Sequence, residues 1–207
     1  MHRPDSVATL RRCAALLLLA ALTLPAAGCT PLGFAAGAGA TAGTAAMQER
    51  GIGGAASDTA VYARVNKLLL DDDLSLYSKV GIEVQEGRVL LTGSVGDPEA
   101  RIRAVRLAWQ AEGVKEVINE IAIGSRDSGN RVRDAWITTQ LSSRLLFDKE
   151  ISSINYNVDT AGGVVYLMGV AQDQRELDRV MRHARDVKYV QRVVNYVRLK
   201  SDPRRPQ

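Results

Sequence analysis

Few side chains in this chain have the types and spacing that catalysis or metal binding requires. His183 is the only histidine after residue 28, so it cannot belong to a histidine-rich metal site. The acidic run Asp71-Asp72-Asp73 lacks the spaced oxygen ligands and the terminal glutamate of a calcium loop. The glycines that bound the predicted strands are typical of turns rather than of a phosphate loop. We therefore expect no enzyme activity, no metal site and no cofactor.

A different chemistry is indicated by the stretch "RDAWITTQLSSRLLF", residues 133–147. Ile137, Leu141 and Leu145 recur every four residues and predict the buried stripe of an amphipathic helix. Trp136 lies about 100° around that helix from Ile137, outside the stripe. Trp136, Gln140, Ser143 and Phe147 share one face at i, i+4, i+7 and i+11, with Arg133, Thr139 and Arg144 beside them.

These residue types are suited to the surface of a phospholipid bilayer. Tryptophan favours the interface because its ring is apolar and its N–H is polar. Arginine pairs with phosphate in a bidentate manner, and a helix N-terminus offers further unpaired N–H groups. The face therefore predicts contact with anionic phospholipid. The alternative, packing of Trp136 against another domain, stays open on the residues alone.

Three blocks of sequence occur twice, each at an offset of 76 residues. "DTAVYARVNKLLLDD" from Asp58 matches "DAWITTQLSSRLLFD" from Asp134. "GRVLLTG" (87–93) matches "GVVYLMG" (163–169), and "GVKEVINEI" (113–121) matches "YVQRVVNYV" (189–197). Between the blocks, the alternation predicts that the second copy loses two residues before its first strand and regains two in the turn. The chain therefore holds two copies of one small domain.

Each copy shows the element order αββαβ. In the first copy, Asp58 is predicted to cap a helix, and "KVGIEVQ" alternates like a half-buried strand. "RVLLTG" has consecutive apolar residues and predicts a more central strand. Asp97-Pro98-Glu99 has the cap, proline and acid of a helix start. The predicted fold class is α+β, with each domain a three-stranded sheet packed by two helices; the strand order stays open.

The beginning of the chain is typical of a secretory signal, residues 1–28. Arg11 and Arg12 precede an apolar run of about 16 residues, shorter than the ~20 that cross a bilayer. "LPAAGC" then places small residues directly before Cys29, which we expect to be acylated. The predicted domains are a Gly/Ala-rich flexible tether (29–57), a first domain (58–124), a linker (125–132), a second domain (133–200) and a disordered tail (201–207).

The charge is distributed unevenly between the two copies. The whole chain has a formal net charge of +4, too small to indicate nucleic-acid binding. From Asp58 to Ile123 there are 8 basic and 11 acidic residues, whereas from Arg131 to Lys200 there are 12 and 8. The first copy also has Ala60 where the second has Trp136. We therefore expect the second domain to carry the contact surface for an anionic membrane.

The repeats "GRVLLTG…VKEVINEI" and "GVVYLMG…VQRVVNYV" resemble BON domains. Together with "LPAAGC", "ERGIGG" and the run Trp-Ile-Thr-Thr, they resemble dual BON-domain outer-membrane lipoproteins of the DolP type. Thr30 follows Cys29, where a retention signal for the inner membrane would have aspartate. The resemblance implies a non-enzymatic, palmitoylated lipoprotein of the outer membrane that faces the periplasm. It further implies binding of anionic phospholipid through the second BON domain, and a role in envelope integrity and at cell division sites.

Two function classes remain from this reasoning. The first is a monomeric phospholipid-binding module whose surface comprises the residues named above on helix 133–147. The second is a protein–protein adaptor for the outer-membrane assembly machinery, with no specific lipid recognition. No nucleic-acid partner is expected in either case, because the chain is predicted to be exported.

Overall fold

The structure is a computed structural model that describes residues 47–124 and 128–205. All of them belong to one compact unit, Ala40–Gln207. The predicted signal segment 1–28 and the predicted acylation site Cys29 lie outside the described residues. Within the described part, no helix combines the length and the apolar character needed to cross a membrane.

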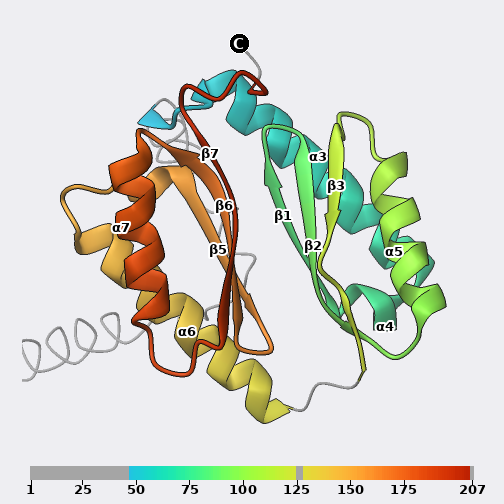
Figure 1. Ribbon diagram of the computed structural model, residues 1–207. Coiled ribbons are helices and arrows are strands. Elements are labelled where there is room, and N and C mark those ends of the chain that lie inside the picture. Colours follow the sequence, from blue (N-terminus) through green and yellow to red (C-terminus); the bar gives the residue numbers. More distant parts are fainter. Residues whose placement is uncertain (1–46, 125–127, 206–207) are drawn as a thin grey trace, which may run out of the picture. The chain divides into compact units, whose positions relative to one another are not determined.

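The first repeat folds as a helical layer on a small sheet (Figure 1). Its elements, in chain order, are α3 (Gly51–Asp72), the short α4 (Leu74–Tyr77), β1 (Val80–Gln85), β2 (Arg88–Val95), α5 (Pro98–Gln110), β3 (Glu116–Asn119) and β4 (Ala122–Ile123). The predicted third strand is thus split in two after Asn119, whose side chain accepts the Ile121 N–H at 3.1 Å. The equivalent Asn195 makes the same contact with the Val197 N–H, but β7 stays continuous. Both β3 and β4 pair with β2 in parallel.

The second repeat has the same order of elements. They are α6 (Ser128–Phe147), a 3-10 turn (Ser153–Asn155), β5 (Tyr156–Ala161), β6 (Val164–Ala171), α7 (Gln174–Arg185) and β7 (Arg192–Leu199). The strands of the two repeats correspond at the constant offset of 76 residues. The predicted loss and gain of two residues between the blocks is therefore wrong, because the turns before β1 and β5 differ in conformation and not in length.

In each sheet the strand with consecutive apolar residues is central, as predicted. The orders are β1-β2-β3 and β5-β6-β7, with β1 and β5 antiparallel to the central strand and β3 and β7 parallel to it. One face of each central strand packs under its helices. Val89 and Leu91 join the core with α3 and α5, and Val165 and Leu167 join the core with α6 and α7. The α+β fold of two tandem αββαβ domains is thus confirmed.

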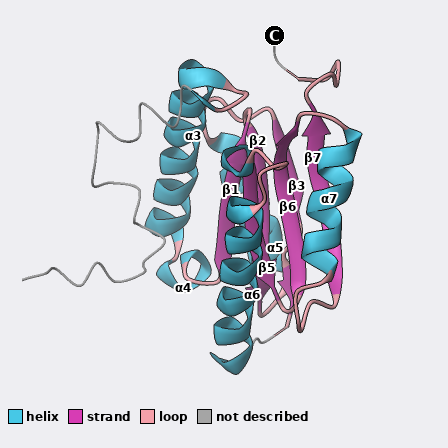
Figure 2. Ribbon diagram, turned by 90° about the vertical axis from the view of Figure 1, so that its left-hand side faces the viewer, coloured by secondary structure: helices cyan, strands magenta, loops and turns pink. Residues whose placement is uncertain are grey.

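The other faces of the two sheets pack against each other. Leu90 of β2 shares a buried cluster with Tyr166 and Met168 of β6, and Ile118, Val194 and Tyr196 pack around it. The molecule is therefore layered helix–sheet–sheet–helix, with both helical layers outside (Figure 1). Figure 2 looks onto the molecule from the side of α6 and α7. This explains the unbroken apolar runs of β2 and β6, which are covered on both faces.

Equivalent positions of the two repeats meet across this contact. Glu83 of β1 faces Asp159 of β5, and the Tyr196 hydroxyl donates a hydrogen bond to Glu120. Each pair is separated by 76 residues, the repeat offset. The two domains therefore meet about a pseudo-two-fold axis, as the subunits of a symmetric dimer would.

Asp58 and Asp134 each fix the hairpin turn of their own domain. Asp58 accepts the N–H groups of Glu86 and Gly87, both at 2.8 Å. Asp134 accepts those of the equivalent turn residues 162 and 163, also at 2.8 Å. The prediction that Asp58 caps its helix is wrong, because α3 begins seven residues earlier at Gly51. By contrast, Asp97 does cap α5, through the Ala100 N–H at 2.7 Å.

Three predicted boundaries differ from the structure. Residues 51–57, predicted as flexible tether, form the first turns of α3, where Ala55 is buried and Arg50 pairs with Asp58 at 2.6 Å. Residues 128–132, predicted as linker, begin α6. Residues 201–205, predicted as disordered tail, make turns that end in the ion pair of Arg205 with Glu86. In the first and third cases tertiary contacts override the low helical or ordering propensity of the local sequence.

Candidate functional site

The candidate site lies on the outer helical layer of the second domain, at α6. The Trp136 side chain is 41% exposed, and its ring meets that of Tyr189 edge-on, with centroids 5.7 Å apart. The Arg133 guanidinium lies 5.5 Å and the Lys188 ammonium 4.7 Å from the centre of the Tyr189 ring. We call these four residues the Trp136 cluster. It combines two exposed aromatic rings with two cations, the composition of a membrane-interface anchor.

Two members of the Trp136 cluster, Lys188 and Tyr189, were missed by the sequence reasoning. Tyr189 has a φ of +70°, a left-handed backbone that a bulky side chain rarely adopts, and the equivalent residue of the first domain is Gly113 with a φ of +92°. Backbone strain of this kind concentrates at functional sites. The repeat itself held the signal: "YVQRV" aligns with "GVKEV", so the second copy has a tyrosine where the first copy has a turn glycine.

The whole Trp136 cluster is specific to the second domain. At the positions of Arg133, Trp136, Lys188 and Tyr189, the first domain has Ser57, Ala60, Glu112 and Gly113. Lys188 also changes the electrostatics of its neighbour, because its hydrogen bond and positive charge lower the pKa of Tyr189. The shared fold thus needs neither the rings nor the cations at these positions.

A second exposed group lies at the C-terminal end of α6, about three turns after Trp136. Phe147 is 81% and Leu146 65% exposed. Arg144 and Phe147 line a shallow hollow together with Lys149, Arg179 and other residues of the loop after α6 and of α7. Eleven residues separate Trp136 from Phe147, which corresponds to about 16 Å along the helix. Trp136 and Phe147 could therefore touch one flat surface.

Asp148 holds this end of the helix in place. Arg179 donates to its carboxylate at 2.6 Å, and His183 lies 2.7 Å from the same oxygen. The hydrogen bond from Arg179, with that of His183, holds the pKa of Asp148 well below its ordinary value. The structure thus gives His183 and Arg179 a shared, partly buried carboxylate as their partner.

The remaining predicted site residues have lesser exposure or other partners. Gln140 and Ser143 are partly buried between Trp136 and Phe147. Thr139 is exposed, but its hydroxyl donates to the Ala135 carbonyl at 2.9 Å. The predicted unpaired N–H groups of a helix N-terminus beside Arg133 and Trp136 are not there, because α6 begins at Ser128 and both residues lie well inside it.

The structure also answers which domain Trp136 faces. The contact between the domains is made by the sheets, whereas α6 packs on the opposite face of the second sheet through Ile137, Leu141 and Leu145. Trp136 therefore lies on the outer side of its domain, with Tyr189 of the same domain as its ring partner. Packing against the first domain does not account for this tryptophan.

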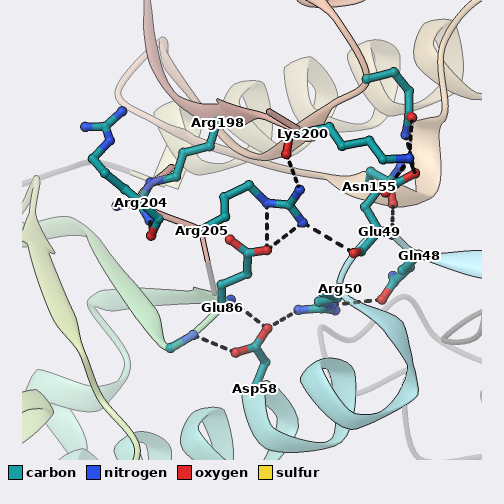
Figure 3. A network of polar contacts seen from close by, with 12 residues as sticks. Gln48, Glu49, Arg50, Asp58, Glu86, Asn155, Arg198, Lys200, Arg204 and Arg205 are labelled. Carbon is teal, nitrogen blue, oxygen red and sulfur yellow. Dashed lines mark hydrogen bonds and ion pairs between the residues drawn. The ribbon is translucent and has the colours of Figure 1, made fainter. Parts of the chain in front are cut away.

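Part of the charge difference between the repeats serves the contact between the domains (Figure 3). Arg205 pairs with Glu86 at 2.8 Å, and Arg198 pairs with Glu116 at 3.2 Å. The segment before α3 joins the same network, since Lys200 lies 3.1 Å from a carboxylate oxygen of Glu49. Some cations of the second copy thus pair with carboxylates of the first domain and of the segment before α3. Only the others are left for the outer surface.

No group of three or more potential metal ligands was found among residues 47–124 and 128–205. The site has surface character: exposed rings, cations and a shallow hollow. This arrangement can adsorb to a polar–apolar interface.

The family of the chain follows from comparison with known proteins. The BON domain family matches residues 57–125 and 133–201, which together make up most of the chain. The chain belongs to the BON-domain family. Its two BON domains correspond to the two layered halves of the structure.

Three relatives resemble this BON-domain protein over most of their length. An uncharacterised protein of the gshII 5' region of Anaplasma centrale is 43% identical over 145 residues, which cover 69% of this chain and 95% of the relative. A 21 kDa hemolysin of Actinobacillus pleuropneumoniae is 32% identical over 74% of this chain and 81% of the relative. Outer membrane lipoprotein DolP of Haemophilus influenzae is 32% identical over 67% of this chain and 73% of the relative. The resemblance to dual BON-domain proteins of the DolP type is thereby confirmed.

Proposed function

We propose that this BON-domain protein is a periplasm-facing outer-membrane lipoprotein that binds anionic phospholipid through α6 of its second domain. The relative named outer membrane lipoprotein DolP supports the location. The observation that carries the lipid contact is the Trp136 cluster, two exposed rings flanked by Arg133 and Lys188 on the outer side of the molecule. The proposed role is support of envelope integrity, with a site of action at cell division.

The binding residues follow from exposure and charge. Trp136 and Tyr189 insert their rings among the headgroups, and Phe147 does so at the far end of α6. Arg133 and Lys188 meet the phosphates at one end, and Arg144 does so at the other. Thr139, Gln140 and Ser143 lie between the two ends and form the polar middle of the contact.

The affinity of this face alone is low. Basic residues near an anionic membrane contribute about 1 kcal/mol each, so Arg133, Arg144 and Lys188 together supply about 3 kcal/mol, which corresponds to a dissociation constant of about 6 mM. Acylation at Cys29 would hold the domains at the membrane and raise the effective concentration of lipid around α6. A weak contact is then sufficient to orient the protein and to favour anionic regions of the membrane.

The decisive measurement is a lipid titration of residues 30–207, which include every described residue. Amide shifts are followed by NMR while anionic or zwitterionic micelles are added. We expect anionic micelles to shift the amides of α6 and of the loop at Tyr189, and zwitterionic micelles to shift them less. Trp136→Glu should abolish these shifts without unfolding the domain, because the indole is exposed.

A matched control is Tyr62→Ala, which removes an aromatic ring of similar exposure from α3 of the first domain. The control should leave the α6 shifts intact. If anionic micelles leave α6 and Tyr189 unshifted in the unsubstituted chain, lipid recognition is refuted. The adaptor for outer-membrane assembly proteins then becomes the better proposal.

A further inference from the structure

The outer helical layer of the first domain carries its own exposed tryptophan. On α5, Trp109 is 52% and Ile102 is 63% exposed, and Arg106 between them is exposed as well. These residues follow the spacing i, i+4 and i+7, so they form one stripe along the helix. The opposite side of α5 is buried through a row of alanines and Leu107. The stripe is therefore a second amphipathic face, which the fold leaves uncovered among the described residues.

The cations beside this stripe form no ion pairs with the described residues of the chain. On the helical layer of the first domain, Arg64 pairs with Glu112, Lys67 with Asp71, and Arg103 with Asp72 and Asp73. Arg101 and Arg106 have no acidic partner among residues 47–124 and 128–205. The two unpaired cations of this layer are thus the ones next to Ile102 and Trp109. The exposed Glu99 lies one turn before Ile102, so the part of the stripe around Arg106 and Trp109 is the part complementary to an anionic and apolar surface.

The two tryptophan-bearing faces point away from each other. The sheets meet through Leu90 and Tyr166, whereas α5 and α6 cover the faces of those sheets that are turned outward. Figure 1 shows α5 and α6 on opposite outer sides of the paired sheets. A flat membrane that touches Trp136 therefore cannot touch Trp109 of the same molecule.

We propose that the α5 stripe of Ile102, Arg106 and Trp109 is a second phospholipid-contact face, so that one molecule bridges two anionic lipid surfaces. The bridging part rests on the proposed lipid contact of α6. The stripe repeats the chemistry of the exposed face of α6, where Trp136, Arg133 and Phe147 supply an indole, an arginine and an exposed large apolar side chain on one helix. Because the stripe runs along the helix, its side chains can enter an interface to the same depth.

The chain offers a direct test, because it has two tryptophans, one on each face. In residues 30–207, Trp136→Phe leaves Trp109 as the only indole, and Trp109→Phe leaves Trp136. Each variant is titrated with vesicles of equal parts phosphatidylglycerol and phosphatidylcholine, and with vesicles of phosphatidylcholine alone. We expect a blue shift of the Trp109 emission, and its quenching by brominated acyl chains, with the anionic vesicles.

The outcomes separate this proposal from the proposed function. If the Trp136 emission shifts and the Trp109 emission does not, the second face is refuted and the α6 contact stands. If neither shifts, the lipid contact of α6 fails as well. If the Trp109 emission shifts with rising protein concentration in the absence of lipid, the stripe binds a second copy, and the lipid proposal is overturned. Thermal unfolding of both variants confirms that they are folded.

Vesicle clustering tests bridging itself. Light scattering should rise when the unsubstituted chain is mixed with anionic vesicles, and should stay low for Trp109→Ser, whose Trp136 still contacts lipid. Tyr62→Ser, on α3 of the same domain, is the matched control and should cluster vesicles normally. Arg106→Gln should weaken the Trp109 contact about fivefold, as expected for one basic residue at an anionic surface. Undiminished clustering by Trp109→Ser would overturn the proposal.

Discussion

Glu83 couples the contact between the two domains to pH. It lies on the face of β1 that meets the second sheet, next to Asp159 and Asn157 of β5, with the Arg50 cation in the vicinity. Burial between the sheets, together with the Asp159 carboxylate, raises the pKa of Glu83 from 4.5 to about 8. The folded protein therefore keeps a proton on Glu83 at neutral pH, which the unfolded chain releases.

The sign of the effect follows from this proton. Between pH 4.5 and pH 8 the folded chain binds one more proton than the unfolded chain, so the free energy of unfolding falls as pH rises. The fall is about 1.4 kcal/mol per pH unit, or about 2.7 kcal/mol from pH 5 to pH 7. Asp148 does not add to this slope, because the pKa that Arg179 lowers lies below the window.

The assay is urea unfolding of residues 30–207 at pH 5, 6 and 7 and constant ionic strength. Trp109 and Trp136 report on one domain each, so the fluorescence shows whether both domains unfold together. Glu83→Gln should remove the slope that Glu83 causes and should make the protein more stable at pH 7. Glu112→Gln, at a carboxylate that is 87% exposed, is the control. If Glu83→Gln and the unsubstituted chain show parallel pH profiles, Glu83 is ionised in the folded state and the reasoning is refuted.

Three further substitutions test other parts of the structure. Tyr189→Gly relieves about 1 kcal/mol of backbone strain and loses a ring contact worth about the same free energy. The free energy of unfolding in urea should therefore change little, while the affinity for anionic micelles should fall. A large loss of stability would contradict this. Asp58→Ala leaves two turn N–H groups without their acceptor and should lower the free energy of unfolding by about 3 kcal/mol; a loss below about 1 kcal/mol would show that water replaces the carboxylate. Arg205→Ala leaves the buried Glu86 carboxylate without its partner and should lower the free energy of unfolding by about 3 kcal/mol. Amide hydrogen exchange at the start of α3 should become faster, and unchanged exchange there would refute the coupling between Arg205 and this segment.

Much of the fold was predictable because the same sequence pattern occurs twice in the chain. The repeated blocks set the element order, and the apolar runs of β2 and β6 identified the central strands. The same runs also held the signal for the contact between the sheets, since a strand covered on both faces has no polar side. That signal was ambiguous, because consecutive apolar residues equally fit a strand that is merely central in its sheet.

The candidate site was predictable in part. Helical spacing placed Trp136 and Phe147 on the outer side of α6, and the structure shows both exposed. The partners in the Trp136 cluster come from the loop before β7, so no spacing within α6 could find them. The early start of α3 was hidden for a related reason. The glycines after Arg50 disfavour a helix locally, and the contacts that hold them come from distant residues.

The pseudo-two-fold contact gives this protein a property that a pair of separate domains would lack. A homodimer of single domains dissociates on dilution, and every residue near its axis must tolerate an identical residue opposite. Here one chain carries both halves, so their association depends on the length of the linker between them and is independent of the protein concentration. Each half is also free to differ from the other. Tyr196 opposite Glu120 is one such difference, and the tryptophan that each half carries on a different helix is another.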